Sequence, residues 1–199
     1  MDPMSAPAHR IRHTYGDYLS LERVSNTRHE FLDGQIYAMS GGTPEHGALA
    51  SAINGQLYPQ LRERGCGAFT SDVRVRTPSG LSTYPDISIV CGPIERDAED
   101  RDAVTNPSVI VEVLSRTTEQ YDRGDKLEHY KSIPSLRQVL LVGQRERAVE
   151  VWTRGESGWS RAVARDGEVA ELAIGARLDV REAYDAAARV ITPPASTMP

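Results

Sequence analysis

The sequence predicts a mixed α/β (α+β) fold, in which a mixed β-sheet is flanked by helices and followed by a C-terminal β-meander. Two hydrophobic runs, 86–91 and 109–114, predict strands, and the second, which is aliphatic except for one residue, is typical of a central strand buried on both faces. An apolar stripe at helical spacing predicts a helix from Pro44 to about Arg64. Short alternating segments between residues 145 and 175 indicate the meander.

The composition is that of an ordinary globular domain. The chain has 199 residues, 39% of them hydrophobic and 26% charged, so it can bury a core without disulfides. We expect one domain at 14–190, with the meander at 145–175 as an appendage and flexible tails at 1–13 and 191–199. No apolar run reaches the roughly 18 residues that span a bilayer, and the N-terminus lacks the apolar core of a secretory signal.

The charge balance excludes a protein that coats nucleic acid through a large positive charge. The net charge is -5 at pH 7, although an enzyme that contacts phosphates locally remains possible. Part of the acid lies in residues 95–102, which we expect to form a mobile loop. Cys66 and Cys91 form no CxxC motif and indicate neither a zinc site nor a disulfide framework. A cytoplasmic location is therefore the expectation.

Turn and capping signals predict the remaining elements. Thr14 is expected to cap a helix that ends near Val24, with Asp17 as its capping-box partner. Asp33-Gly34 predicts a hairpin between the runs on either side of it. The other expected elements are strands at 73–76, 138–142, 149–152 and 159–163, and helices at 121–132 and 180–188.

Glu112 is the most informative residue of the chain. It interrupts a run of aliphatic residues that is typical of a central strand. An unpaired carboxylate costs several kcal/mol in such a place, so a proton, a basic side chain or a cation has to neutralise it. The simplest explanation is a salt bridge between Glu112 and an arginine inside the fold.

Asp86 raises a second possibility. It opens the other apolar strand, directly after Tyr84-Pro85. If the two strands are neighbours, the carboxylates of Asp86 and Glu112 meet at one surface of the sheet, where a hard divalent cation relieves their repulsion. Mg²⁺ prefers carboxylates, waters and phosphate oxygens. Taken alone, Asp86 is typical of a turn or capping aspartate.

The helix after Glu112 contributes a third group. Asp122, Lys126 and His129 are spaced i, i+4, i+7 and share one face, and the only other lysine of the chain is Lys131. In one interpretation Asp122 and Lys126 form a solvated pair that contributes about 0.3–0.5 kcal/mol. In the other, Lys126 points at the carboxylates, where its ammonium positions a water and stabilises charge developing on phosphorus.

In their order and spacing, these motifs resemble the PD-(D/E)xK nuclease superfamily and, within it, the Uma-two-type putative restriction endonucleases. The matching segments read YPDISIV from residue 84, VIVEVLS from residue 109 and DRGDK from residue 122, with Tyr130. The resemblance covers about residues 14–153. It implies a restriction-endonuclease-like fold and hydrolysis of DNA with Mg²⁺, for which Mn²⁺ can substitute.

The resemblance also implies the residues of the site. Asp86, Glu112 and the main-chain carbonyl of Val113 would bind the metal, and Asp86, Glu112 and Lys126 would be catalytic. The superfamily lysine stands two residues after the strand glutamate, and that position here is Leu114. Lys126 would therefore substitute for it from the helix.

Three further residues are expected to support the site. Asp122 would orient Lys126 or a water. Glu30 would hold a metal-bound water, or would form a salt bridge with a neighbouring arginine. His46 would line the same cleft, or would be a core histidine satisfied by the backbone.

Two other function classes stay open. One is a catalytically silent member of the same fold that binds nucleic acid or a protein partner, which Leu114 and the acidic balance favour. The other is a structural oligomer in which Glu112 pairs with arginine. For the nuclease we expect DNA as the partner, no membrane, and a homodimer or higher homo-oligomer, because self-association helps a single domain to hold a duplex.

Overall fold

The computed structural model describes residues 11–191, and the parts of the expected tails at 1–10 and 192–199 lie outside the described residues. Its elements, in chain order, are α1 (Tyr15–Val24), β1 (His29–Leu32), β2 (Gln35–Ala38), α2 (Pro44–Arg62), β3 (Cys66–Thr70), β4 (Arg74–Arg76), β5 (Ser82–Thr83), β6 (Ile87–Cys91), β7 (Ala103–Val104), β8 (Val109–Leu114), α3 (Glu119–Arg123), α4 (Asp125–Lys131), β9 (Gln138–Gly143), β10 (Ala148–Gly155), β11 (Gly158–Arg165), β12 (Val169–Glu171), β13 (Arg177–Asp179) and α5 (Val180–Ile191).

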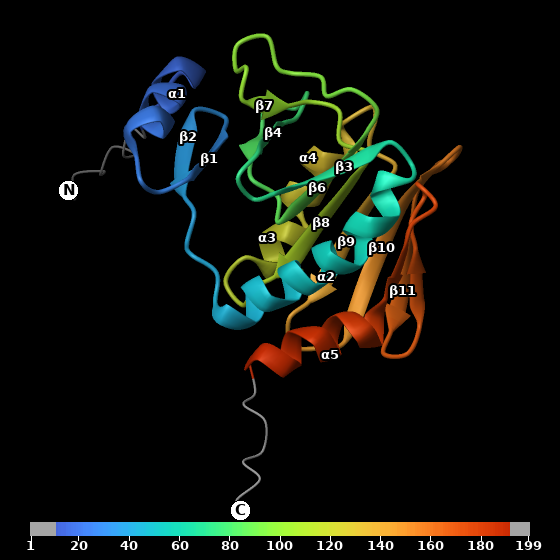
Figure 1. The fold of residues 1–199 in the computed structure, drawn as a ribbon. Coiled ribbons are helices and arrows are strands. Elements are labelled where there is room, and N and C mark those ends of the chain that lie inside the picture. The colour runs from blue at the N-terminus through green and yellow to red at the C-terminus, as the bar shows by residue number, and fades with distance from the viewer. Residues whose placement is uncertain (1–10, 192–199) are drawn as a thin grey trace, which may run out of the picture.

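A six-stranded sheet of order β11-β10-β9-β8-β6-β3 forms the centre of the molecule (Figure 1). β8 and β9 are parallel, joined through α3 and α4, and the other neighbouring strands are antiparallel. The two apolar runs are neighbours as expected, with Ile87 opposite Val111. This mixed sheet with flanking helices confirms the predicted fold class. However, β10 and β11 are part of the central sheet, with β11 at its edge, so this part of the meander is not an appendage. β12 and β13 form a small sheet of their own.

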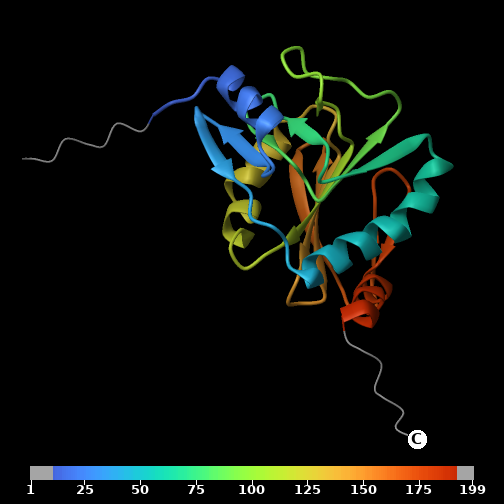
Figure 2. The ribbon, with the colours of Figure 1, turned by 60° about the vertical axis from the view of Figure 1, so that its left-hand side comes forward.

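Helices cover both faces of the central sheet. Figure 2 shows α2 (cyan) and α5 (red) on one side of it and α3 and α4 (yellow) on the other. Side chains of β8 alternate between the two cores: Val111 and Val113 pack with α2 and α5, whereas Ile110 and Leu114 pack with α4. Because successive side chains of a strand point to opposite faces, Glu112 points toward α4.

A second sheet, of order β2-β1-β5-β4-β7, carries the N-terminal part of the chain. The predicted capping box of Thr14 and Asp17 starts α1, and the predicted hairpin joins β1 to β2 through Asp33 (φ 50°) and Gly34 (φ 77°). The chain crosses from this sheet to the central one through residues 84–86. Asp86 therefore lies at the junction of the two sheets.

The acidic loop is anchored, contrary to the expectation that it is mobile. Asp100 is buried and accepts hydrogen bonds from Arg74 Nε at 2.5 Å and Nη2 at 3.1 Å. The phenol of Tyr15 donates to the same carboxylate at 3.1 Å. Burial opposes the ionisation of Asp100, but the hydrogen bond and charge of Arg74 outweigh it and hold the pKa below its usual range. These contacts attach the loop to β4 and α1.

The helix expected at 121–132 is divided in two at Gly124. This residue has φ -102° and ψ -109°, a conformation that L-residues with a side chain avoid. A Cβ at this position would lie 3.0 Å from the carbonyl oxygen of Gln120. The glycine therefore permits a break that the helical spacing of the sequence did not predict.

The two cysteines form a disulfide, which corrects the expectation that they indicate none. Cys66 and Cys91 stand directly opposite each other in β3 and β6, with their Cα atoms 4.0 Å apart. The pairing depends on strand register, which a separation of 25 residues does not reveal. None of the helices between residues 11 and 191 combines the length and apolar character needed to cross a bilayer.

We predict that Asp100→Asn lowers the free energy of unfolding at pH 7 by about 2 kcal/mol, because the buried Arg74 loses its closer carboxylate partner and keeps only Glu22, at 3.3 Å. Since the pKa of Asp100 is lowered by folding, its ionised form stabilises the protein above about pH 4. The difference from the wild type should shrink as the pH falls below that value. Chemical denaturation as a function of pH measures both effects. Asp102→Asn, an exposed exchange in the same loop, is the control, and equal losses in the two variants would contradict the anchoring role.

Candidate active site

The carboxylate of Glu112 lies inside the protein, with only 4% of the residue exposed. Its Oε1 is 2.9 Å from Lys126 Nζ and accepts a hydrogen bond from the hydroxyl of Tyr130. Its Oε2 accepts from the main-chain N–H of Asp86 at 3.3 Å. Burial raises the pKa of Glu112 above its usual range, and the charge of Lys126 acts in the opposite direction. Among the described residues, Glu112 forms an ion pair with an ammonium and none with a guanidinium, so the arginine alternative is wrong.

Lys126 is the centre of a buried ion-pair cluster. Its ammonium lies 2.9 Å from Glu112, 3.1 Å from Glu30 and 3.5 Å from Asp122. Desolvation lowers the pKa of Lys126, but the surrounding carboxylates outweigh it and raise the pKa above the usual value. The break at Gly124 does not separate Asp122 from Lys126. The solvated-pair interpretation is therefore wrong, because both side chains are buried.

Asp86 faces the end of β8 rather than the lysine. Its Oδ2 accepts a hydrogen bond from the main-chain N–H of Val113 at 2.7 Å. The N–H and the carbonyl of one strand residue point to the same side, so the carbonyl of Val113 is also directed toward Asp86. Two hydrogen bonds thus link Asp86 and Glu112. The carboxylate of Glu112 accepts the N–H of Asp86 itself, and the carboxylate of Asp86 accepts the N–H of the residue after Glu112.

His46 packs against this pair from the first turn of α2. Its Nε2 is 3.2 Å from Asp86 Oδ2. The hydrogen bond to Asp86 raises the pKa of His46, burial opposes that change, and the main chain of Val113 adds to it. The N-cap Thr43 accepts from the backbone N–H of His46 at 3.3 Å. A Cβ on Gly42 would lie 2.9 Å from His46 Nδ1, so only glycine leaves room for the ring.

The N-terminal sheet supplies the last carboxylate. Glu30 of β1 is 8% exposed and accepts a hydrogen bond from the hydroxyl of Thr83 in β5. The same oxygen makes the 3.1 Å ion pair with Lys126. The two sheets therefore meet at this lysine.

These groups form one wall of a large open cleft, with a volume of about 2020 Å³, between the N-terminal sheet, the start of α2 and the end of β8. The cluster holds more acids than bases. Four carboxylates are balanced by one lysine and by His46 when it is protonated. Such a surplus of negative charge favours the uptake of a cation.

The structure brings together all six side chains that the sequence predicted for the site, and the main chain of Val113. His129, which shares the predicted helix face, lies elsewhere and has its Nδ1 2.8 Å from Ser79 Oγ. Sequence reasoning missed the roles of Gly42 and Thr83, and no pattern in the sequence marks either. Tyr130 was recognised only as part of the family motif, although its spacing of four from Lys126 could have placed it beside Glu112.

The donor set fits Mg²⁺ or Mn²⁺. Within residues 11–191, no three His, Cys, Asp or Glu side chains are arranged to hold one metal ion. The site instead offers two carboxylates and a main-chain carbonyl, and Mg²⁺ typically takes one or two protein carboxylates and completes its shell with water and phosphate. A carboxylate within β8, a second one directly before β6, an adjacent carbonyl and a lysine form the arrangement that the resemblance to restriction-endonuclease-like proteins leads us to expect.

Comparison with known proteins gives the family. A family model named Uma2 and described as “Putative restriction endonuclease” matches residues 15–181. The chain belongs to this family.

The chain is also similar to two proteins of one organism and to a solved structure. “Uncharacterized protein slr1290” of Synechocystis sp. is 34% identical over 143 residues, which are 71% of this chain and 74% of that protein. “Uncharacterized protein sll1609” of the same organism is 30% identical over 148 residues, 73% of this chain and 84% of that protein. The crystal structure of a putative nuclease belonging to DUF820 from Anabaena variabilis aligns with a TM-score of 0.64 and 20% identity, covering 82% of this chain and 93% of that chain. This last likeness establishes the fold.

We predict that Lys126→Met lowers the free energy of unfolding by about 3–5 kcal/mol at pH 7, because three buried carboxylates lose their shared counterion. Denaturant unfolding of the purified variant measures the loss. Lys131→Met is the matched control, since Lys131 is the only other lysine and pairs with the exposed Glu128. A loss for Lys126→Met no larger than that for Lys131→Met would show that the cluster does not depend on the ammonium.

Proposed function

We propose that the protein is a Mg²⁺-dependent endonuclease that hydrolyses DNA phosphodiester bonds. The observation that carries the proposal is the convergence of Asp86, Glu112 and Lys126 on one wall of an open cleft. Membership of a family described as restriction endonucleases supports the reaction class. The cleft is open and its volume of about 2020 Å³ exceeds the roughly 300–1,000 Å³ of typical small-molecule pockets, which favours a polymer substrate.

Asp86, Glu112 and the carbonyl of Val113 are the groups that would hold the metal. Oδ1 of Asp86 takes part in no hydrogen bond or ion pair of the described residues, and Oε2 of Glu112 is turned toward Asp86. Both oxygens are hard donors, so Mn²⁺ should substitute for Mg²⁺. When bound, the metal supplies Lewis-acid stabilisation of the negative charge on the phosphodiester.

Lys126 provides the second electrostatic element of the mechanism. Its ammonium orients the attacking water and stabilises the charge that develops on the phosphoryl oxygens. Glu30 and Asp122 position the ammonium, because each forms an ion pair with it from a different element. His46 positions the carboxylate of Asp86 in the same way. Assembly into a homodimer or higher homo-oligomer and the cytoplasmic location stay predictions.

We expect wild-type protein with Mg²⁺ or Mn²⁺ to nick supercoiled plasmid. Asp86→Asn and Glu112→Gln should each lower the rate by two to three powers of ten, since one strong electrostatic stabiliser contributes roughly 3 kcal/mol. Calorimetric titration with Mn²⁺ should show binding that both variants lose. Glu156→Gln, at an exposed turn far from these residues in the sequence, is the control and should cut normally. Nicking that survives in both site variants would refute the assignment.

Lys126→Arg distinguishes the enzyme from a catalytically silent relative. The substitution keeps the positive charge of the cluster but replaces the compact ammonium with a larger, planar group. Mn²⁺ binding should therefore persist while the nicking rate falls by at least tenfold. Wild-type protein that binds Mn²⁺ and DNA but never nicks DNA would favour the silent alternative.

A further inference from the structure

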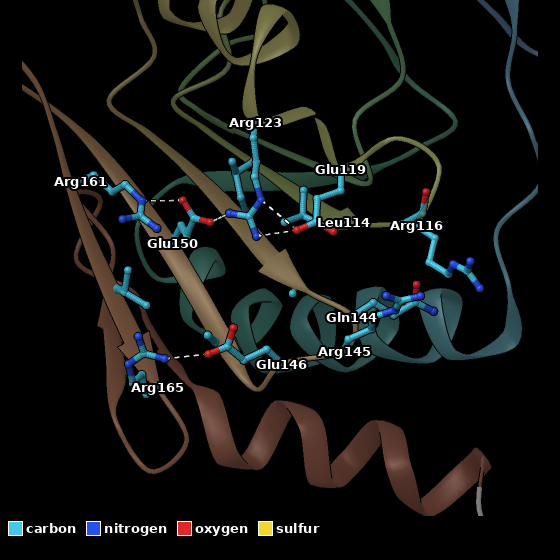
Figure 3. Close-up of a pocket in the computed structure, with 15 residues that line it drawn as sticks. Leu114, Arg116, Glu119, Arg123, Gln144, Arg145, Glu146, Glu150, Arg161 and Arg165 are labelled. Atoms are coloured by element: carbon cyan, nitrogen blue, oxygen red, sulfur yellow. Dashed lines mark hydrogen bonds and ion pairs between the residues drawn. The ribbon is translucent and has the colours of Figure 1, made fainter. Parts of the chain in front are cut away.

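A second, smaller pocket adjoins the cleft at the carboxyl ends of β8 and β9. It has a volume of about 210 Å³ and is bounded on its far side by β10 and β11 (Figure 3). Five arginines and three glutamates line it, a local excess of positive charge on a chain whose net charge is -5. The pocket is therefore suited to an anion.

Two of the arginines remain available to such a ligand. Within residues 11–191, neither Arg116 nor Arg145 forms an ion pair with a carboxylate, and both are exposed. The three glutamates of the pocket are all engaged by other arginines: Glu119 by Arg123, Glu150 by Arg123 and Arg161, and Glu146 by Arg165.

The strand register places these two arginines at the start of adjacent loops that line the same pocket. Leu114, the last residue of β8, pairs with Gly143, the last residue of the parallel strand β9. Arg116 and Arg145 each follow two residues later, so each of the two strands is followed, at the same number of residues, by an arginine. Figure 3 shows Arg116 and Arg145 at one end of the pocket, away from the paired Glu150 and Arg161.

Both loops are held by contacts of their own. After β8, the hydroxyl of Ser115 accepts from the backbone N–H of Thr118 at 3.2 Å. After β9, Gln144 Nε2 donates to Thr43 Oγ1, the cap of α2, at 2.9 Å. The phenol of Tyr184 donates to the carbonyl of Ala148 at 3.2 Å, at the end of the same loop. Little ordering of the loop backbone is therefore needed when a ligand binds, and the cost falls on the two arginine side chains.

Arg116 and Arg145 also line the cleft of the candidate active site, so the pocket and the cleft are continuous. Arg116 follows the proposed metal ligand Val113 by three residues. Guanidinium groups bind phosphate oxygens bidentately and stay charged at every physiological pH. Building on the proposed function, we propose that Arg116 and Arg145 bind a phosphate of the nucleic-acid backbone next to the one that is hydrolysed. The cleaved strand then runs from the metal site across the carboxyl ends of β8 and β9.

The test compares the double variant Arg116→Gln/Arg145→Gln with Arg62→Gln/Arg189→Gln. The control loses the same charge from α2 and α5, at residues that line neither cavity. Fluorescence anisotropy in EDTA measures binding of a labelled DNA duplex, with and without 5′-phosphates, over a range of salt concentrations. We expect the first variant to bind roughly tenfold more weakly or worse, and its salt slope to fall by about 0.9 for the lost phosphate contact. Mn²⁺ binding should be unchanged in both variants.

Three outcomes would overturn the inference. If wild-type protein binds and nicks DNA but the two double variants bind equally, this inference fails and the proposed function stands. If the loss is confined to the 5′-phosphorylated duplex, the two arginines hold a terminal phosphate and the continuous strand is wrong. If wild-type protein binds neither duplex, the assignment of DNA as substrate fails as well.

Discussion

The burial of one carboxylate, that of Glu112, is the constraint on which the candidate site depends. A central strand can hold an ionised glutamate only if its oxygens find partners there. Lys126 and Tyr130 satisfy one oxygen and the main chain of Asp86 satisfies the other. Two of these partners come from α4 and the third directly precedes β6, so the need to neutralise Glu112 fixes α4 on one face of β8 and the start of β6 at its side.

The sequence predicts those features of the site that depend on strand or helix spacing or on a few consecutive residues. The aliphatic run of β8 predicted a buried strand, and the charge within it predicted a partner. The spacing of four between Asp122 and Lys126 placed both on one helical face, and this pairing survived the break at Gly124. The capping box at Thr14 and the turn at Asp33 are equally local, since each depends on a few consecutive residues.

Contacts between residues far apart in the sequence cannot be predicted from such local patterns. The disulfide, the anchoring of Asp100 by Arg74 and the contact between Glu30 and Lys126 join residues far apart in the sequence. The pair formed by Arg116 and Arg145 depends on the parallel register of β8 with β9, which no motif encodes. The composition of the acidic loop predicts mobility, whereas buried contacts of Asp100 with Arg74 and Tyr15 anchor it.

The position of Glu30 has a consequence for how such a site varies among related chains. The groups suited to hold a cation all belong to the central sheet and its junction, whereas the lysine is also oriented from β1, on a separate sheet. Substitutions in the N-terminal hairpin can therefore change the alignment of the ammonium and leave the cation-binding oxygens intact. Under the proposed function, ion affinity and substrate turnover would then depend on different parts of the chain, so a few substitutions in β1 and β2 would suffice to turn an enzyme into an inert binder.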